Sequence, residues 1–326
     1  MWRPVTTICI KRQYKRNKKT LLFGVKIIVG GGLVLWLIER VDWERVGAQI
    51  YDISLPFLFL YIVFQLLGNL ISAKKWQIIA SLKELHFTVK EGFFAYLTGA
   101  FINNFLPSTL GGDAYRSLWL AKRSGARAAA LSTVIFDRFI GLWTMALLAL
   151  ALSPLLFPFI RESIPLALIL AALAIFFIVD LVITYAYCQS WFHVLVARLP
   201  FHKLRRFLEE IIFYTKKHIW WRTSLWSALF IFTGIALSNF ALFHSLGSAI
   251  GFIPFLSVIF LVTIISAVPL SINNIGIKEW AYITFFGLIG VSAETAVTVA
   301  LLSRFMQMLI SFIALPQYLR KEDIKQ

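Results

Sequence analysis

The sequence predicts an all-α polytopic integral membrane protein, with about six full spans and two re-entrant helical hairpins that enter from opposite faces. Three observations lead to this fold class. Apolar residues make up 59% of the 326 residues, mean hydropathy is +0.78, and only 15% of the residues are charged, whereas a soluble domain averages about half apolar and a quarter charged. The apolar residues form long runs, and most basic residues lie between these runs. The distribution of basic residues then requires the hairpins.

Nine apolar segments are candidates for helices in the membrane, where a full span needs about 20 residues. They lie at about 21–38, 54–72, 91–106, 128–152, 164–187, 224–246, 253–268, 279–290 and 296–316. The first follows the basic stretch KRQYKRNKK and lacks a small-x-small cleavage site. We therefore expect an uncleaved first helix, with residues 1–20 as a basic cytoplasmic tail.

The first hairpin is predicted from the positive-inside rule. If every segment crosses the membrane, the basic residues of 116–127 and 188–222 fall outside, which the rule disfavours. A hairpin at about 91–127 that enters and leaves on the cytoplasmic face removes both conflicts. Three basic residues are then outside, four lie within membrane segments, and the other 25 of the 32 are cytoplasmic. The outside set is Arg40, Arg45 and Arg161, and the membrane set is Lys26, Arg138, Lys278 and Arg304.

The second hairpin is expected at about 253–290, entering from the outside. Its stretch AVPLSINNIGIKEW shares proline, paired asparagine, glycine and charge with the stretch FINNFLPSTLGGDAYR of the first hairpin. Irregular backbone at membrane depth is tolerated only where protein or water covers it. Two such hairpins from opposite faces are typical of an inverted-repeat transporter core, so we expect an inverted repeat.

The two broken stretches and the charges near them predict a polar path for a lipid head group. Freed amides at helix N-termini can bind an anion, glycines allow its close approach, and charges within the membrane are functional candidates. The candidate path is Asn103, Asn104, Pro107, Gly111, Gly112, Asp113, Arg116, Asp137, Arg138, Pro269, Asn273, Gly276, Lys278, Glu279 and Arg304. A structural alternative stays open, in which Asp113 pairs with Arg116 and Glu279 with an arginine to hold the hairpins together.

Other features are assigned more plainly. The segment at about 191–222 has helically spaced apolar residues among basic ones, which predicts an amphipathic helix on the inner leaflet. Asp180 is interpreted as a pairing partner for another helix. The net charge of +16 follows membrane topology, so no nucleic-acid partner is expected. Cys9 and Cys188 are interpreted as free thiols, and no spacing predicts a metal site or a catalytic residue.

A family resemblance rests on these same motifs. The stretches NNFLPSTLGGDAYR, DRFIGL and VPLSINNIGIKEW, together with Arg304, resemble the lysylphosphatidylglycerol synthase transmembrane-region family, whose members are also called flippase-like or UPF0104-type membrane proteins. The resemblance covers about residues 20–320. It implies one flippase-like domain at 21–319, a cytoplasmic tail at 320–326, and a multi-pass protein of the bacterial inner membrane with both termini cytoplasmic.

The chain departs from the family pattern at two positions. Asn274 stands where many members have glycine, and Lys278 stands where they have arginine. Lysine keeps the positive charge but lacks the planar bidentate fork, so the family's head-group contact is not carried over to Lys278.

The resemblance implies a protein that binds a polar lipid or lipid-linked envelope intermediate, with an anionic head group, and translocates it. In bifunctional members a separate soluble C-terminal domain transfers the aminoacyl group, and this chain ends at Gln326 after its last helix. We therefore expect no enzyme activity and no cofactor. The alternative is a non-transporting, lipid-binding subunit of a membrane glycosyltransferase or lipid-synthesis enzyme, docked through 191–222. A small-solute transporter is a third hypothesis, without a solute-specific motif.

Overall fold

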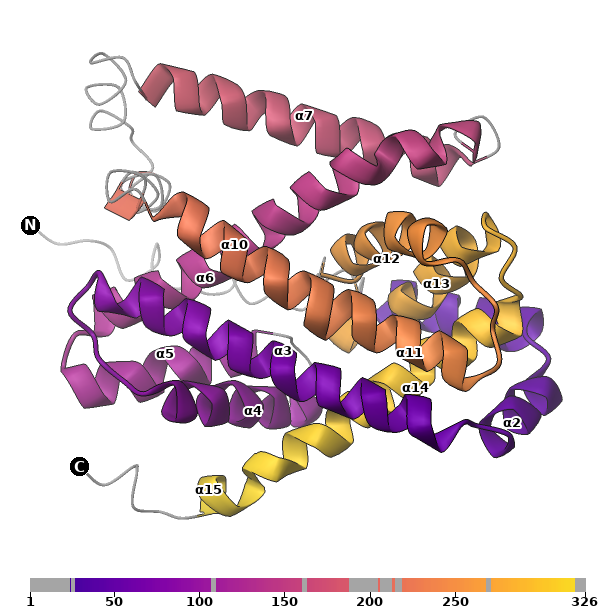
Figure 1. The fold of residues 1–326 in the computed structure, drawn as a ribbon, viewed down its shortest axis with the longest axis horizontal. Helices are drawn as coiled ribbons and strands as arrows, with labels where there is room; N and C mark the ends of the chain where they lie inside the picture. The colour runs from indigo at the N-terminus through magenta and orange to yellow at the C-terminus, as the bar shows by residue number, and fades with distance from the viewer. Residues whose placement is uncertain are drawn as a thin grey trace, which may run out of the picture.

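The structure is a computed structural model that describes residues 24, 27–106, 110–159, 163–187, 205, 213–214, 219–267 and 271–319. In these ranges the chain is helical and forms no strand, which confirms the predicted all-α class (Figure 1). The predictions for the tails at 1–20 and 320–326, and for most of 191–222, lie outside the described residues. So do Pro107 and Pro269.

The helices follow a helical stretch at residues 27–40. They are α2 (Trp43–Tyr51), α3 (Leu55–Ser81), α4 (Val89–Phe105), α5 (Gly111–Ser124), α6 (Arg127–Leu152), η1 (Ser153–Phe159), α7 (Ile164–Tyr187), α10 (Trp220–Phe230), η2 (Ile231–Leu237), α11 (Ser238–Ser245), α12 (Phe252–Ala267), η3 (Ile272–Asn274), α13 (Ile277–Gly287), α14 (Ala293–Ser311), η4 (Phe312–Ala314) and α15 (Leu315–Leu319).

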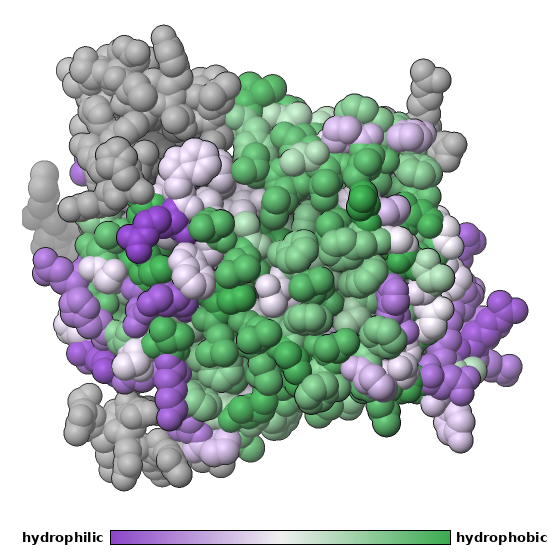
Figure 2. Space-filling model, in the orientation of Figure 1, coloured by the Kyte–Doolittle hydropathy of each residue, from purple (hydrophilic) through white to green (hydrophobic). Residues whose placement is uncertain are grey.

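Several helices are long and apolar enough to cross a membrane. Among the described residues these are Leu55–Ser81, Arg127–Phe159, Trp220–Ser245 and Ala293–Gln317, and Ile164–Val179 and Phe252–Ala267 are shorter apolar helices. In Figure 2 a broad apolar surface covers the middle of the visible face, and hydrophilic residues gather toward its two ends. The chain is therefore a multi-pass membrane protein.

Local sequence explains where the helices begin. Pro56 lies in the first turn of α3, and Thr88 and Glu91 form a capping box at the start of α4. Between the first two predicted segments lies α2, which begins after the N-cap Asp42. The prediction that the second segment ends at residue 72 was wrong, because α3 continues to Ser81 and carries Lys75 into the interior.

The centre of the molecule is an antiparallel pair formed by α3 and the continuous helix α10–η2–α11. The amide of Ser54, before α3, donates to the carbonyl of Ser245, at the end of α11, at 2.8 Å. Farther along, Gly68 meets Gly234 so closely that a β-carbon on Gly68 would lie 2.6 Å from the Gly234 Cα. Residues Ile231–Leu237 form a π-helix at this crossing, an irregularity that is frequent at functional sites.

The two predicted hairpins are present and open toward opposite ends. α4 and α5 are antiparallel neighbours, and an ion pair between Arg123 and Glu91 joins their open ends. α12 and α13 form the second pair. The first hairpin begins where α3 ends and the second begins where α11 ends. Because α3 and α11 run antiparallel, the hairpins open at opposite ends of the molecule. Their entry from opposite faces of the membrane stays a prediction.

The hairpins belong to two structural repeats related by a constant offset in residue number, which we call the repeat offset. It takes the start of α5 at Gly111 to the start of α13 at Ile277, and the start of α6 at Arg127 to the start of α14 at Ala293. The first arm of each hairpin packs against the long helix of the other repeat, α4 on α14 and α12 on α6. The same offset takes Gly68 to Gly234. The crossing therefore lies on the pseudo-two-fold axis of an inverted repeat.

Candidate functional site

A buried ionic network lies between the first hairpin and helices α3 and α6. The Asp137 carboxylate is 3.0 Å from the Lys75 Nζ through Oδ1 and 3.0 Å from an Arg116 guanidinium nitrogen through Oδ2. The Tyr96 hydroxyl donates to the same Oδ2, and the Arg116 guanidinium lies 4.0 Å from the Tyr96 ring centroid. These Lys75, Arg116 and Asp137 side chains are each 5–6% exposed. This geometry positions the first hairpin against α3 and α6.

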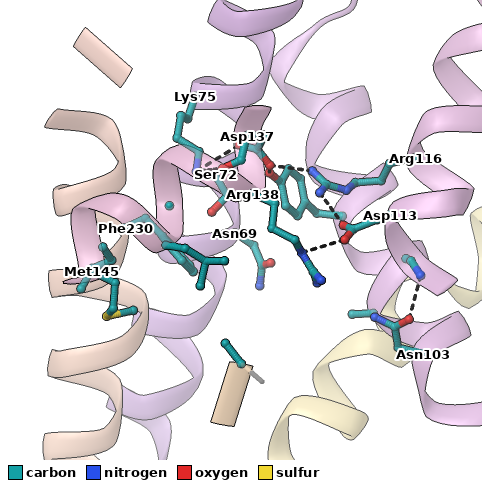
Figure 3. A pocket seen from close by; sticks show the side chains of 18 of the residues that line it. Asn69, Ser72, Lys75, Asn103, Asp113, Arg116, Asp137, Arg138, Met145 and Phe230 are labelled. Atoms are coloured by element: carbon teal, nitrogen blue, oxygen red, sulfur yellow. Dashed lines mark hydrogen bonds and ion pairs between the residues drawn. The ribbon is translucent and has the colours of Figure 1, made fainter. Parts of the chain in front are cut away.

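Arg116 and Arg138 share the carboxylate of Asp113, which lies in the first turn of α5. Arg116 contacts Oδ1 at 2.7 Å and Arg138 contacts Oδ2 at 2.8 Å. Figure 3 shows Arg138 and Asp113 facing each other, and Arg116 reaching between Asp113 and Asp137. The Arg138 side chain is 41% exposed, whereas that of Arg116 is 6% exposed. These contacts favour the structural alternative for Arg116 and leave Arg138 as the accessible cation.

The tip of the first hairpin gives Gly112 a packing role. The Gly112 amide donates to the Asn103 side-chain oxygen at 2.7 Å. A β-carbon on Gly112 would lie 2.5 Å from the carbonyl oxygen of Gly99. Gly111 similarly faces Leu106. Both glycines therefore allow α4 and α5 to pack closely, and their role toward a head group stays a prediction.

Replacing Gly112 with alanine should accordingly weaken folding. The new methyl group meets backbone rather than a flexible side chain, so α4 and α5 must separate at a cost of about 1–3 kcal/mol. Thermal unfolding of the purified protein measures this loss. Gly287→Ala is the matched control, because a β-carbon there meets nothing within 4 Å. Equal melting temperatures for the two variants would contradict the packing role of Gly112.

The second hairpin carries a counterpart of the Asp113–Arg138 ion pair. Glu279, which is 2% exposed, accepts from the Gly276 amide at 2.7 Å and pairs with an Arg304 guanidinium nitrogen at 3.0 Å. Arg304 also donates to the carbonyl oxygens of Asn273 and Asn274 at 2.9 and 3.3 Å. The repeat offset takes Asp113 to Glu279 and Arg138 to Arg304. Each repeat therefore closes its hairpin with an acid and an arginine at equivalent positions.

The tip of the second hairpin has an unusual backbone. Asn273, Asn274 and Gly276 have φ angles of 49°, 56° and 85°, in the left-handed region that asparagine tolerates and glycine prefers. The Asn274 side-chain nitrogen donates to the Ser266 carbonyl, while its oxygen is buried without a hydrogen-bond partner among the described residues. Lys278 donates from Nζ to the Ser303 hydroxyl at 2.6 Å.

Two adjoining cavities lie between the hairpins. The first, of about 420 Å³, contains the Asp113–Arg138 pair and the edge of the buried network, and we call it lobe 1. The second, of about 460 Å³, contains Lys278 and Arg304, and we call it lobe 2. The lobes share the lining residues Asn69, Ala100, Phe230, Ser266, Ala267 and Asn274. The two lobes therefore adjoin each other beside the central helix crossing.

The two lobes are equivalent under the repeat offset. The residues of α6 that line lobe 1 include Arg138, Gly141 and Met145, and their equivalents on α14, which line lobe 2, are Arg304, Gln307 and Ser311. Ala100 and Ser266 are also an equivalent pair, and they lie where the lobes meet. The cavity is therefore part of the repeat and not an accident of packing in one half.

Most of the predicted path residues come together around these lobes. Those that line a lobe are Asn103, Gly112, Asp113, Arg116, Asp137, Arg138, Asn273, Lys278 and Arg304. Asn104 instead donates to Ser311 at 2.9 Å. Gly276 is packed against Leu33, and Glu279 reaches the site through Arg304. The side chain of Asp180 lies outside the described residues.

Sequence reasoning missed Lys75, Tyr96 and the carboxamides of α3. Lys75 was assigned to the cytoplasm because it follows the apolar run. Its helical spacing from Gly68, Ser72 and Ile79, which are all buried, is a signal that could have placed it inside. Tyr96 gave no comparable signal, since an aromatic residue in a membrane segment is most often ordinary packing.

The fold and the site together define a multi-pass membrane protein with an inverted hairpin repeat around a charged interior cavity. A family model described as the lysylphosphatidylglycerol synthase TM region matches residues 23–314, and the chain belongs to this family. It is also 26% identical over 126 residues to a UPF0104 membrane protein of Methanocaldococcus jannaschii. That match covers 38% of this chain and 36% of the relative.

Proposed function

We propose that the protein binds a polar lipid, or a lipid-linked intermediate, and moves its head group across the membrane. The observation that carries the proposal is the pair of equivalent lobes, each with an acid and an arginine at the hairpin that closes it. An inverted repeat with a central polar site is the arrangement that alternating access requires, because the two halves can exchange conformations. The proposal includes no enzyme activity.

Charge supports an anionic head group. Around lobe 1 the cations Lys75, Arg116 and Arg138 face the carboxylates Asp113 and Asp137. Around lobe 2, Arg304 pairs with the carboxylate Glu279, and Lys278 lines the cavity. With Lys278 protonated, each described cluster has one positive charge in excess. In a site of low dielectric, such an excess attracts an anion strongly.

The orientation follows from the charges at the two ends. At the open end of the first hairpin the described residues include Lys83, Lys90, Lys122, Arg123, Arg127 and Arg222, with Glu84 and Glu91. The other end includes Arg40 and Arg45, with Glu39, Asp42, Glu44, Asp52 and Glu294. We propose that the basic end lies at the cytoplasmic face of a bacterial inner membrane, with both termini on that side.

Cysteine labelling in whole cells tests this orientation. Cys9 and Cys188 are first replaced by serine, and single cysteines are then placed at Ser124 and at Glu44, which are both exposed. A membrane-impermeant thiol reagent added outside should label position 44 and leave position 124 unlabelled until the cells are opened. Rapid outside labelling at position 124 would reverse the proposed orientation.

Transport is tested with the purified protein in vesicles that contain fluorescent phospholipids with different head groups. An impermeant quencher added outside destroys the outer-leaflet signal, and translocation exposes the inner-leaflet lipid as well. The assay is run with and without proton and sodium gradients, because the energy source is part of the question. The control is Arg123→Ala, which removes an ion pair at the exposed surface. Quenching equal to that of empty vesicles for every head group, with lipid still bound, would instead favour the accessory-subunit hypothesis.

A further inference from the structure

Lobe 2 is unusually rich in carboxamide side chains. They come from α3, from α11, from the tip of the second hairpin and from α14, so they surround the cavity. The set is Gln65, Asn69, Asn239, Asn273, Asn274 and Gln307. Carboxamides at membrane depth are costly unless they are hydrogen-bonded, and phosphate recognition alone does not require them.

The amide nitrogens of this set are largely used within the protein. Those with protein acceptors are Gln65 to the Ser238 hydroxyl at 3.2 Å, Asn69 to the Gln65 carbonyl at 3.0 Å, Asn239 to the Ile235 carbonyl at 2.8 Å, and Asn274 to the Ser266 carbonyl. Each of these nitrogens keeps a second N–H, and the Asn239 oxygen accepts from the Tyr282 hydroxyl at 2.9 Å. The other side-chain oxygens of the set have no such protein donor among the hydrogen bonds of the described residues. A ligand that satisfies these acceptors must carry hydroxyl or amine hydrogens.

Asn274 gives the most specific indication. The residue is 9% exposed and lines both lobes, and its side-chain oxygen has no hydrogen-bond partner among the described residues. Its backbone is held at φ 56° while Arg304 binds its carbonyl. A buried acceptor without a partner is unfavourable, so a ligand hydroxyl that reached this oxygen would stabilise the site.

The charge of lobe 2 decides between a hydroxyl donor and an ammonium donor. In the described part of the chain, Lys278 forms no ion pair with a carboxylate. Arg304 there pairs with one carboxylate, that of Glu279. An ammonium group would enter beside two cations and one carboxylate, and like charges repel strongly there. Uncharged hydroxyls fit the acceptors, and a phosphate fits the cations.

We infer that the head group is a phosphate diester that carries a sugar or another polyol. Its phosphate lies against Lys278 and Arg304, and its hydroxyls donate to Asn274 and Asn69. A lobe of about 460 Å³ is within the usual size range of small-ligand sites. This inference rests on the proposed function, because it names the class of lipid that the same cavity takes.

The test measures lipid binding to the purified full-length protein by native mass spectrometry. Phosphatidylinositol presents phosphate and ring hydroxyls, phosphatidic acid presents phosphate alone, and phosphatidylethanolamine presents phosphate and ammonium. Phosphatidylinositol should bind about tenfold more tightly than either of the other two, because a site built for hydroxyl donors discriminates against ligands that lack them.

Two variants identify the residues responsible. Asn274→Gly keeps the left-handed backbone accessible. It should weaken the binding of phosphatidylinositol about tenfold and change the binding of phosphatidic acid less than about twofold. Asn69→Leu should also weaken the binding of phosphatidylinositol, and it replaces Asn274→Gly as the test if that variant does not fold. The control is Gln49→Leu, because Gln49 contacts Thr295 and Thr298 and lines neither lobe.

Each outcome has a defined meaning. Equal binding of phosphatidylinositol and phosphatidic acid by the unmodified protein, or tighter binding of phosphatidylethanolamine, would overturn the inferred head group and leave the proposed lipid function standing. A selective preference that neither variant reduces would overturn the roles of Asn274 and Asn69. Binding of none of the three lipids would count against the proposed function itself.

Discussion

Replacing Asp137 with alanine is expected to lower the free energy of unfolding by about 3–5 kcal/mol. The carboxylate is 5% exposed and receives Lys75, Arg116 and the Tyr96 hydroxyl. Its removal leaves two buried cations close together, with Asp113 as the remaining carboxylate of the network. An uncompensated charge in the interior costs more than the loss of one ordinary contact, because its desolvation is no longer offset.

The melting temperature of the purified protein should fall by roughly 10 °C for this variant. Arg123→Ala is the control, because its ion pair with Glu91 joins side chains that are 47% and 31% exposed, and exposed pairs contribute about 0–1 kcal/mol. Removing charge of both signs, with Lys75→Met and Asp137→Asn in one chain, should recover much of the loss. If Asp137→Ala alone has the same melting temperature as the unmodified protein, the structural role of the network is contradicted.

The hairpins could be predicted from sequence because charge is costly on the wrong side of a membrane. The positive-inside rule keeps the basic residues of 122–127 on the same side as the N-terminal tail, and this predicts the first hairpin without any knowledge of packing. Arg116, counted with them from the sequence, is instead buried with Asp113 and Asp137. Lys75 could not be assigned in this way. It lies just past an apolar run, where lysine is usually at the interface, and only the position of Asp137 explains its burial.

The repeat was suspected from sequence for a reason that proves to be wrong in detail. The repeat offset takes Asn103 to Pro269, and so the paired asparagines at 103–104 and 273–274 are not equivalent. They also act differently, since Asn103 accepts from the Gly112 amide whereas the asparagines at 273–274 form the left-handed turn. The correct pairs, such as Asp113 with Glu279, are too few to stand out in the sequence.

Asn274 shows how a departure from the family pattern gains meaning in the structure. Sequence comparison suggested only that asparagine replaces a frequent glycine there. The structure adds that the position has a φ of 56°, that the residue lines both lobes, and that its buried side-chain oxygen has no hydrogen-bond partner among the described residues. A glycine would satisfy the backbone equally well but would offer no acceptor to a ligand.

The two equivalent arginines should respond differently to alanine, and the comparison separates transport from stability. Arg304→Ala leaves Glu279, which is 2% exposed, without its arginine, and frees the carbonyls of Asn273 and Asn274. We expect it to cost about 3–5 kcal/mol and to abolish lipid translocation. Arg138→Ala leaves Asp113 paired with Arg116, so its cost should be about 1 kcal/mol or less. Its translocation rate should nevertheless fall at least about tenfold, which corresponds to about 1.4 kcal/mol at the barrier.

Lysine substitutions at the same positions test the reason for this difference. Arg138→Lys keeps a cation at lobe 1 and should retain much of the transport rate. Arg304→Lys keeps the charge, but its single ammonium group cannot replace the planar guanidinium that binds two carbonyls and a carboxylate at once. This variant should therefore be destabilised as Arg304→Ala is. Transport is measured with the fluorescent-lipid vesicles, and stability by the thermal unfolding described above.

If Arg138→Ala transports lipid at the unmodified rate, the Asp113–Arg138 pair does not control the path, and lobe 1 only holds the first hairpin in place. If it loses transport while its melting temperature is unchanged, the pair acts on the lipid, because no structural defect remains to explain the loss.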